Sequence, residues 1–225
     1  MFHVRPGDHS NPIRGATSGV RFNRVKDYYE QVWERLPERL QPPELDLRRR
    51  FLLSEVRRGD RVLDLGCGAG TFTAMLAAAG AAVTGVEVAE AALSRARAAH
   101  PELDFRLVPL GDPLSFDDGE FDLVWASEVI EHVADTERWL RDVARLLTPG
   151  GRLLVTTPNH PRAALAAWGI EHYSDPFGDH LHLYARGSLA SALTELGLEQ
   201  VEVRAVGGLP LLKRLLLARA IKSPS

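Results

Sequence analysis

A glycine-rich stretch in the first third of the sequence carries the residues with the clearest chemical consequence. Gly66, Gly68 and Gly70 alternate directly after the apolar run of residues 61–65, which contains Asp64. Glycine permits positive φ angles and lets a ligand approach the backbone without a Cβ atom in the way. A carboxylate beside the turn would repel a pyrophosphate and attract an ammonium group. The stretch therefore predicts a binding turn for a ligand with a cationic end.

The spacing of the glycines separates two kinds of nucleotide-binding turn. Dinucleotide sites use G-x-G-x-x-G, whose backbone must hold a pyrophosphate, whereas this sequence has G-x-G-x-G after an acid. That difference disfavours a nucleotide-dependent oxidoreductase. A ligand that joins a nucleoside to a cation fits better, and S-adenosylmethionine carries both a sulfonium and an α-amino group.

A second group of polar residues has spacings suited to proton transfer or metal binding. Glu128, Glu131 and His132 stand at i, i+3 and i+4, so a helix would place them on one face. His180 and His182 stand at i and i+2, and an extended segment would place them on one face. An imidazole is suited to removing the proton of a hydroxyl, which makes His132 and His180 the candidate bases. Carboxylates and imidazoles together hold divalent ions of the Mg or Zn kind, and the candidate ligands are Glu128, Glu131, His132 and His180.

Alternating strands and helices must position these residues. Apolar runs predict strands at 61–65, 82–87, 104–108, 121–126, 152–157 and 199–206, and helical patterns lie between them at 70–79, 89–99, 135–147 and 188–196. Such alternation implies right-handed crossovers and a doubly wound, mostly parallel, Rossmann-like α/β sheet in three layers, with helices on both faces. Ligands of such sheets bind beyond the carboxyl ends of the strands.

Taken in order, the motifs resemble those of class I S-adenosylmethionine-dependent methyltransferases of the type 11/12-like kind, similar to ubiquinone-type O-methyltransferases. The matching stretches, over about residues 45 to 206, are VLDLGCGAG, VTGVEV, LVPLGDPLSF, FDLVWASEVIEHV and LLTPGGRLLVTTPN. The resemblance implies that Glu87 accepts hydrogen bonds from the ribose hydroxyls and that Asp112 lies near the adenine amino group. It implies a cofactor site formed by Asp64, Gly66, Cys67, Gly68, Gly70, Glu87, Val88, Leu110, Gly111, Asp112, Ser127 and Glu128.

The sequence E-x-x-E-H with a later histidine is similar to the metal site of some metal-dependent methyltransferases. These include enzymes of ubiquinone-type O-methylation and enzymes that methylate RNA 3′ ends. The same letters also occur in members without a metal, where Glu128 and His132 line the cofactor pocket. A divalent metal such as Mg is therefore a prediction that stands beside the cofactor. Cys67 is interpreted as a small filler between glycines, because nothing near it in the sequence would lower its pKa.

The composition is that of an ordinary globular protein. Of the 225 residues, 45% are hydrophobic and 25% are charged, with a net charge of −3, so nothing points to a nucleic-acid partner. A single cysteine, Cys67, excludes an intrachain disulfide and fits a reducing compartment. The stretch MFHVRPGDHSNP lacks the apolar core of an export signal. We expect a cytoplasmic protein.

We expect one domain over residues 21–206, flanked by two extensions. The domain comprises N-terminal helices at 25–56, a cofactor-binding core at 60–157 and an aromatic-rich substrate loop at 158–186. Residues 1–20 are rich in Gly, Pro, Ser and Asn and are predicted to form a flexible arm. Residues 207–225 depart from the family pattern of a final antiparallel strand. They have the pattern of an amphipathic helix, which would pack on the domain or contact a membrane.

The function expected from these features is S-adenosylmethionine-dependent O-methylation of a small or lipid-like molecule, with S-adenosylhomocysteine as the product. Two alternatives stay open. One is an RNA methyltransferase with metal-assisted 2′-O-methylation, for which the only dense basic cluster is Arg48 to Arg50. The other is a protein that binds S-adenosylmethionine without catalysis.

Overall fold

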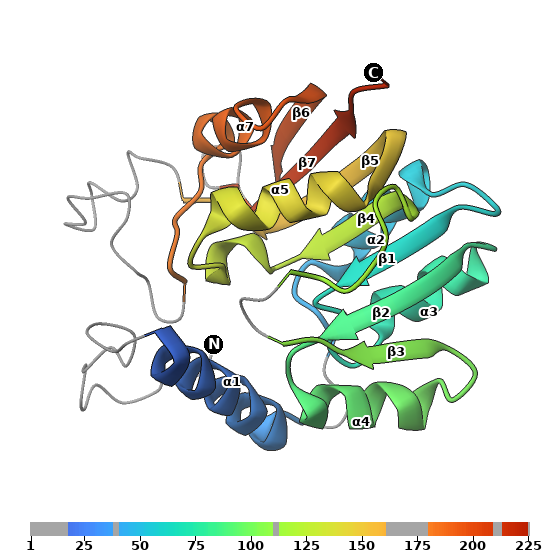
Figure 1. The fold of residues 1–225 in the computed structure, drawn as a ribbon, viewed down its shortest axis with the longest axis vertical. Coiled ribbons are helices and arrows are strands. Elements are labelled where there is room, and N and C mark those ends of the chain that lie inside the picture. The colour runs from blue at the N-terminus through green and yellow to red at the C-terminus, as the bar shows by residue number, and fades with distance from the viewer. Residues whose placement is uncertain (1–17, 38–40, 110–112, 161–179, 209–212, 225) are drawn as a thin grey trace.

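The computed structural model describes residues 18–37, 41–109, 113–160, 180–208 and 213–224 of the chain (Figure 1). The strands are β1 (Arg61–Leu65), β2 (Ala82–Glu87), β3 (Asp104–Leu107), β4 (Phe121–Ser127), β5 (Leu147–Pro158), β6 (Leu198–Val206) and β7 (Leu215–Lys222). The helices are α1 (Ser18–Arg35), α2 (Leu45–Glu55), α3 (Thr71–Ala78), α4 (Glu90–Ala99), the 3₁₀ turn η1 (Ile130–His132), α5 (Thr136–Leu146) and α7 (Arg186–Thr194).

The strands form one sheet in the order β3-β2-β1-β4-β5-β7-β6. The pairings from β3 across to β5 are all parallel, and β7 is antiparallel to both of its neighbours. The strand order reverses between β1 and β4, which is the position where ligands bind in doubly wound sheets. The predicted α/β fold class is confirmed.

Helices cover both faces of the sheet and bury two apolar layers. On one face, α5 and α7 pack over Leu63, Val124 and Val155. On the other, α2 and α3 pack over Val62 and Trp125, and α4 packs against β3. Strands covered on both faces lose the alternation of apolar and polar residues, which accounts for the continuous apolar runs in the sequence.

The predicted amphipathic helix over residues 207–225 is wrong, because residues 215–222 form strand β7 inside the sheet. Leu217 pairs with Thr156 of β5 and with Arg204 of β6, so the strand is covered on both sides. The Lys222 ammonium donates to the carbonyls of Arg145 and Leu147. A short apolar run buried on two faces has no strand periodicity, so the helical interpretation had no internal contradiction. The domain therefore extends past residue 206.

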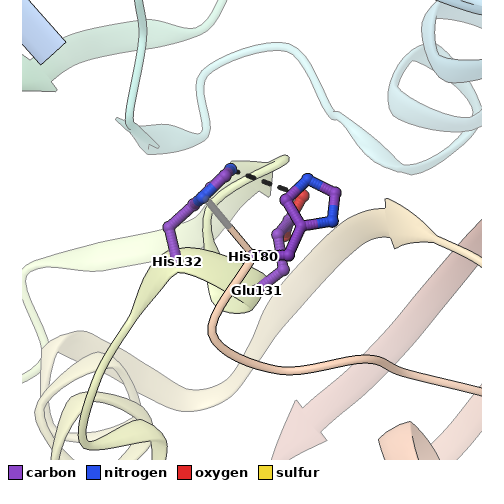
Figure 2. A group of neighbouring side chains, drawn as sticks. All are labelled: Glu131, His132 and His180. Carbon is purple, nitrogen blue, oxygen red and sulfur yellow. Dashed lines mark ion pairs between the residues drawn. The ribbon is translucent and has the colours of Figure 1, made fainter. Parts of the chain in front are cut away.

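The carboxyl edge of the sheet gathers most of the predicted site residues. The glycine turn follows β1 there, Glu87 ends β2, and η1 follows β4. Figure 2 shows Glu131 and His132 of η1 beside His180, which precedes α7. Within the described residues, no helix is both long and apolar enough to span a bilayer.

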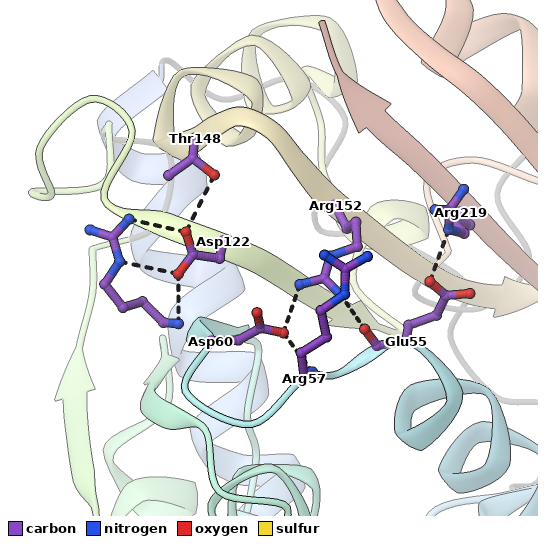
Figure 3. Close-up of polar contacts among 8 residues, drawn as sticks. Glu55, Arg57, Asp60, Asp122, Thr148, Arg152 and Arg219 are labelled. Atoms are coloured by element: carbon purple, nitrogen blue, oxygen red, sulfur yellow. Dashed lines mark hydrogen bonds and ion pairs between the residues drawn. The ribbon is translucent and has the colours of Figure 1, made fainter. Parts of the chain in front are cut away.

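The amino edge of the sheet carries a buried ion pair with no site residue near it (Figure 3). The Arg152 guanidinium of β5 lies 2.6 Å from the Asp60 carboxylate and also donates to the carbonyl of Glu55. Asp60 accepts a further hydrogen bond from the backbone amide of Arg57 at 2.7 Å. These contacts join the end of α2 and the start of β1 to the middle of the sheet. A second pair, Arg61 with Asp122, is largely exposed.

Arg152→Met should lower the free energy of unfolding by about 3–5 kcal/mol, because it leaves the Asp60 carboxylate buried without its cation. Urea denaturation followed by circular dichroism measures this loss. Arg61→Met is the matched control, since it removes the same kind of side chain from an exposed pair on the same edge, and we expect a much smaller loss. Equal losses from the two variants would contradict the role assigned to the buried pair.

Candidate functional site

The glycine turn after β1 has left-handed backbone at each of its three glycines. The φ angles are +76° at Gly66, +53° at Gly68 and +81° at Gly70, a region that residues with a Cβ atom adopt only with strain. The amides of Gly66 and Cys67 both donate to the carbonyl of Val86 at 2.9 Å. The turn is therefore fixed to the neighbouring strand β2 and leads directly into α3.

Side chains of the protein itself approach the glycines closely. A Cβ atom on Gly66 would lie 2.5 Å from Val129 Cγ2, and one on Gly68 would lie 2.9 Å from the ring of Trp33. A Cβ atom on Gly70 would lie 2.8 Å from Phe105. These positions therefore do not admit a residue larger than glycine unless Val129, Trp33 or Phe105 moves away.

Asp64, the acid before the turn, is almost completely buried and is held by α3. The hydroxyl of Thr73 donates to its Oδ2 atom at 2.6 Å. Burial raises the pKa of Asp64 to about 7, and the nearby Glu87 carboxylate adds to that rise, while the hydrogen bonds from Thr73 oppose it. Cys67 is buried as well, and burial raises the pKa of its thiol, in keeping with its interpretation as a filler.

Glu87, at the end of β2, accepts hydrogen bonds from three backbone amides. Those donors are Gly68 at 3.1 Å, Val88 at 2.7 Å and Ala89 at 3.2 Å. Burial raises the pKa of Glu87, and the three amides oppose that rise. The carboxylate thus lies between the glycine turn and the start of α4, with its orientation set by the backbone.

Helix α1 lies beside both halves of the site. The Glu30 carboxylate accepts hydrogen bonds from the amides of Glu90 and Ala91 at 2.8 Å each, which satisfies free donors at the start of α4. Arg95 of α4 donates in return to carbonyls at the end of α1. These contacts place Trp33 over Gly68 and Tyr29 edge-on to His132, with ring centroids 5.8 Å apart.

Three of the four predicted metal ligands come together, and they are Glu131, His132 and His180 (Figure 2). One donor atom from each lies within 4.8 Å of the other two. The rings of His132 and His180 are 5.0 Å apart, and His132 Nε2 lies 3.9 Å from Glu131 Oε1. Glu131 is buried and accepts a hydrogen bond from the Thr157 hydroxyl at 2.9 Å. Burial and the Glu128 carboxylate raise its pKa well above the usual value.

Glu128 does not share a helical face with Glu131 and His132, so that part of the sequence prediction is wrong. Its φ angle is +57°, and only residues 130–132 form a short 3₁₀ turn. The side chain instead forms a 2.9 Å ion pair with Arg48 of α2. Arg48 is buried and also donates to the Ser127 hydroxyl at 3.4 Å.

Sequence reasoning missed three residues of this edge. It grouped Arg48 with the dense basic cluster of residues 48–50, but Arg48 alone in that cluster is buried. It did not consider Thr73, three residues beyond the last glycine, or His160, whose ring is 5.9 Å from that of His180. The one sequence feature that could have pointed to Thr73 is its position in the first turn of the helix that follows the last glycine. Leu110, Gly111 and Asp112 lie outside the described residues.

A parallel sheet with one reversed strand, a glycine turn after β1 and an acid at the end of β2 define the class I S-adenosylmethionine-dependent methyltransferases. A family model described as a methyltransferase domain matches residues 32–203. The chain belongs to this methyltransferase family.

Named relatives agree with that membership. A ubiquinone biosynthesis O-methyltransferase from Bordetella avium is 36% identical over 157 residues, which are 65% of this chain and 65% of that protein. One from Pseudomonas aeruginosa is 35% identical over 173 residues, covering 72% and 75% of the two chains. The solved Burkholderia thailandensis 1,6-didemethyltoxoflavin-N1-methyltransferase, with bound S-adenosylhomocysteine, has a TM-score of 0.64 at 19% identity, covering 89% and 86%. At 19% identity, the similarity to this solved structure supports the fold alone.

Gly66→Ala should destabilise the protein at least twice as much as Gly150→Ala. The two glycines have φ angles of +76° and +77°, so both variants carry the same left-handed strain of about 1–2 kcal/mol. Only at Gly66 would the new methyl group meet a side chain, that of Val129, whereas nothing lies within 4 Å at Gly150. Thermal unfolding of both variants measures the difference. Equal losses would show that Val129 does not confine the turn.

Proposed function

We propose that this protein is an O-methyltransferase that transfers the methyl group of S-adenosylmethionine to a hydroxyl of a small or lipid-like molecule. The observation that carries the proposal is the position of the Glu131, His132 and His180 cluster on the same sheet edge as the glycine turn. A methyl donor and a group able to take a hydroxyl proton are both needed for O-methylation. The ubiquinone biosynthesis O-methyltransferase relatives support the same chemistry.

The residues around the glycine turn fit the parts of the cofactor. The three glycines have left-handed backbone that keeps the turn free of Cβ atoms, which would let a ligand approach the backbone closely. Asp64 would attract the ammonium group, and Glu87 would accept hydrogen bonds from the ribose hydroxyls. The buried guanidinium of Arg48, which pairs with Glu128 just after β4, would also attract the carboxylate of the cofactor. Asp112 stays the predicted neighbour of the adenine.

Methyl transfer from a sulfonium is an in-line displacement, so positioning supplies much of the rate. The acceptor oxygen must also lose its proton. His132 is the first candidate for the base and His180 the second, since a neutral imidazole accepts a proton near neutral pH. Glu131 lies 3.9 Å from His132, so its carboxylate would stabilise the imidazolium once the proton has moved. Tyr29 packs against the edge of the same ring and limits its rotation.

The same cluster would also hold a divalent metal. Of the two kinds of ion considered from the sequence, one carboxylate and two imidazoles with donor atoms within 4.8 Å suit Zn²⁺ better than Mg²⁺, which prefers oxygen ligands. When bound, such an ion would act as a Lewis acid that lowers the pKa of the acceptor hydroxyl. Because Glu128 forms an ion pair with Arg48, the proposed metal ligands are the other three residues, Glu131, His132 and His180.

The proposed function also includes the kind of methyl acceptor and the location of the protein in the cell. A hydroxyl acceptor fits the relatives named as O-methyltransferases, and a phenolic hydroxyl suits a base of imidazole strength. The proposed membrane contact through a C-terminal helix has lost its support, because that segment contains strand β7. A cytoplasmic location is proposed from the sequence alone.

Glu87→Ala should weaken the binding of S-adenosylhomocysteine by about 1.5–3 kcal/mol, the range for hydrogen bonds to a charged group. Isothermal titration calorimetry measures the dissociation constant. Glu87→Gln should lose less, because its amide keeps one acceptor oxygen at the same place, and Glu102→Ala, at an exposed position, should change nothing. Unchanged affinity in a folded Glu87→Ala protein would remove Glu87 from the cofactor site.

His132→Ala should lower kcat for methyl transfer by about 10²–10⁴-fold while leaving the affinity for S-adenosylhomocysteine unchanged. The assay follows label from S-[methyl-³H]adenosylmethionine into a phenol that carries an apolar side chain, with His100→Ala as the control. Removal of metal with EDTA and restoration with Zn²⁺ then separates the two roles, because a simple base needs no metal. Full activity in the His132→Ala variant would refute the proposed site.

A further inference from the structure

Thr73 carries a hydroxyl that the methyl-transfer reaction itself does not require. It lies in the first turn of α3, three residues after Gly70, and its side chain is fully buried. Its hydroxyl donates to Asp64 Oδ2 at 2.6 Å, and its backbone amide also donates to that carboxylate. In a helix, a threonine hydroxyl commonly bonds to a carbonyl of its own preceding turn, so this hydroxyl is committed to a residue of the cofactor site.

We propose that Thr73 is a positioning residue for cofactor binding, which keeps the Asp64 carboxylate ionised and aimed at the glycine turn so that it attracts the cofactor's ammonium group. The inference rests on the proposed cofactor role of Asp64 and extends it to a residue that does not itself reach the ligand. A hydroxyl that donates to a carboxylate favours its charged form, and a short bond between two buried groups also fixes its orientation.

The groups around Asp64 explain why its ionisation depends on the Thr73 hydroxyl. The ionisable groups facing Asp64 are Glu87 from β2 and the buried Cys67 thiol from the turn, and the Glu87 carboxylate disfavours a second negative charge. Helix α3 carries no charged side chain, and the register neighbour in β4 is Trp125. Desolvation raises the pKa of Asp64 to about 7, with the Thr73 hydroxyl opposing the rise. Near neutral pH, a small change in these contacts therefore changes the ionised fraction greatly.

The test measures how the affinity for S-adenosylhomocysteine depends on pH. In the wild-type protein the affinity should rise with pH through about 7, as Asp64 ionises. Thr73→Val should move that midpoint up by roughly one pH unit, which weakens binding roughly fivefold at pH 7 and less than about twofold at pH 8.5. Thr73→Ser keeps the hydroxyl and should restore the wild-type midpoint. Thr71→Val, in the same helical turn, should leave it in place.

A ligand without the amino-acid end separates Asp64 from Glu87. Because 5′-methylthioadenosine keeps the ribose but lacks the ammonium group, any effect of Glu87 appears for both ligands, whereas the effect of Asp64 appears only for S-adenosylhomocysteine. Equal pH profiles of the two ligands in the wild-type protein would overturn the inference even if Thr73→Val failed to fold. A loss in Thr73→Val that is the same at every pH would reduce Thr73 to a packing residue.

Asp64→Asn distinguishes failure of this inference from failure of the proposed function. If Asp64→Asn weakens S-adenosylhomocysteine binding and removes its pH dependence, while Thr73→Val leaves the midpoint unchanged, the inference alone is wrong. If Asp64→Asn binds as tightly as the wild type, the cofactor role of Asp64 itself is wrong, and the role of Thr73 falls with it.

Discussion

The candidate site depends on keeping carboxylates buried at the carboxyl edge of the sheet. Asp64, Glu87 and Glu131 are all buried there, and a buried carboxylate needs hydrogen-bond donors in place of the solvent that it has lost. Each acid finds them locally: Thr73 for Asp64, three amides for Glu87 and Thr157 for Glu131. The conformation of the glycine turn and the starts of α3 and α4 follow from this requirement.

Burial of Asp64 and Glu87 lowers the stability of the folded protein near neutral pH. The pKa of Asp64 is raised from 3.8 to about 7 in the folded protein, so its contribution to stability is full below about pH 4 and is lost as the pH rises through about 7. The Glu87 carboxyl acts in the same direction. At the opposite edge of the sheet, Arg152 and Asp60 form a buried ion pair that links three segments of the chain.

The sequence predicted the features that depend on local pattern, which include the sheet, the glycine turn, and the acid at the end of β2. It failed where the partner is distant in the chain. Glu128 was placed with Glu131 by helical spacing, but Arg48, 80 positions earlier, holds its side chain, and its positive φ angle ends the regular backbone. Strand β7 was missed because the run Leu215–Lys222 becomes a strand by pairing with β5 and β6, and that pairing cannot be inferred from the run itself.

Helix α1 contacts both groups of candidate site residues at the carboxyl edge. Glu30 satisfies amides at the start of α4, directly after the proposed cofactor acid Glu87, while Tyr29 of the same helix contacts His132. Trp33, one turn further on, lies over Gly68 between them. The same helix therefore contacts both the glycine turn and the imidazole of the proposed base.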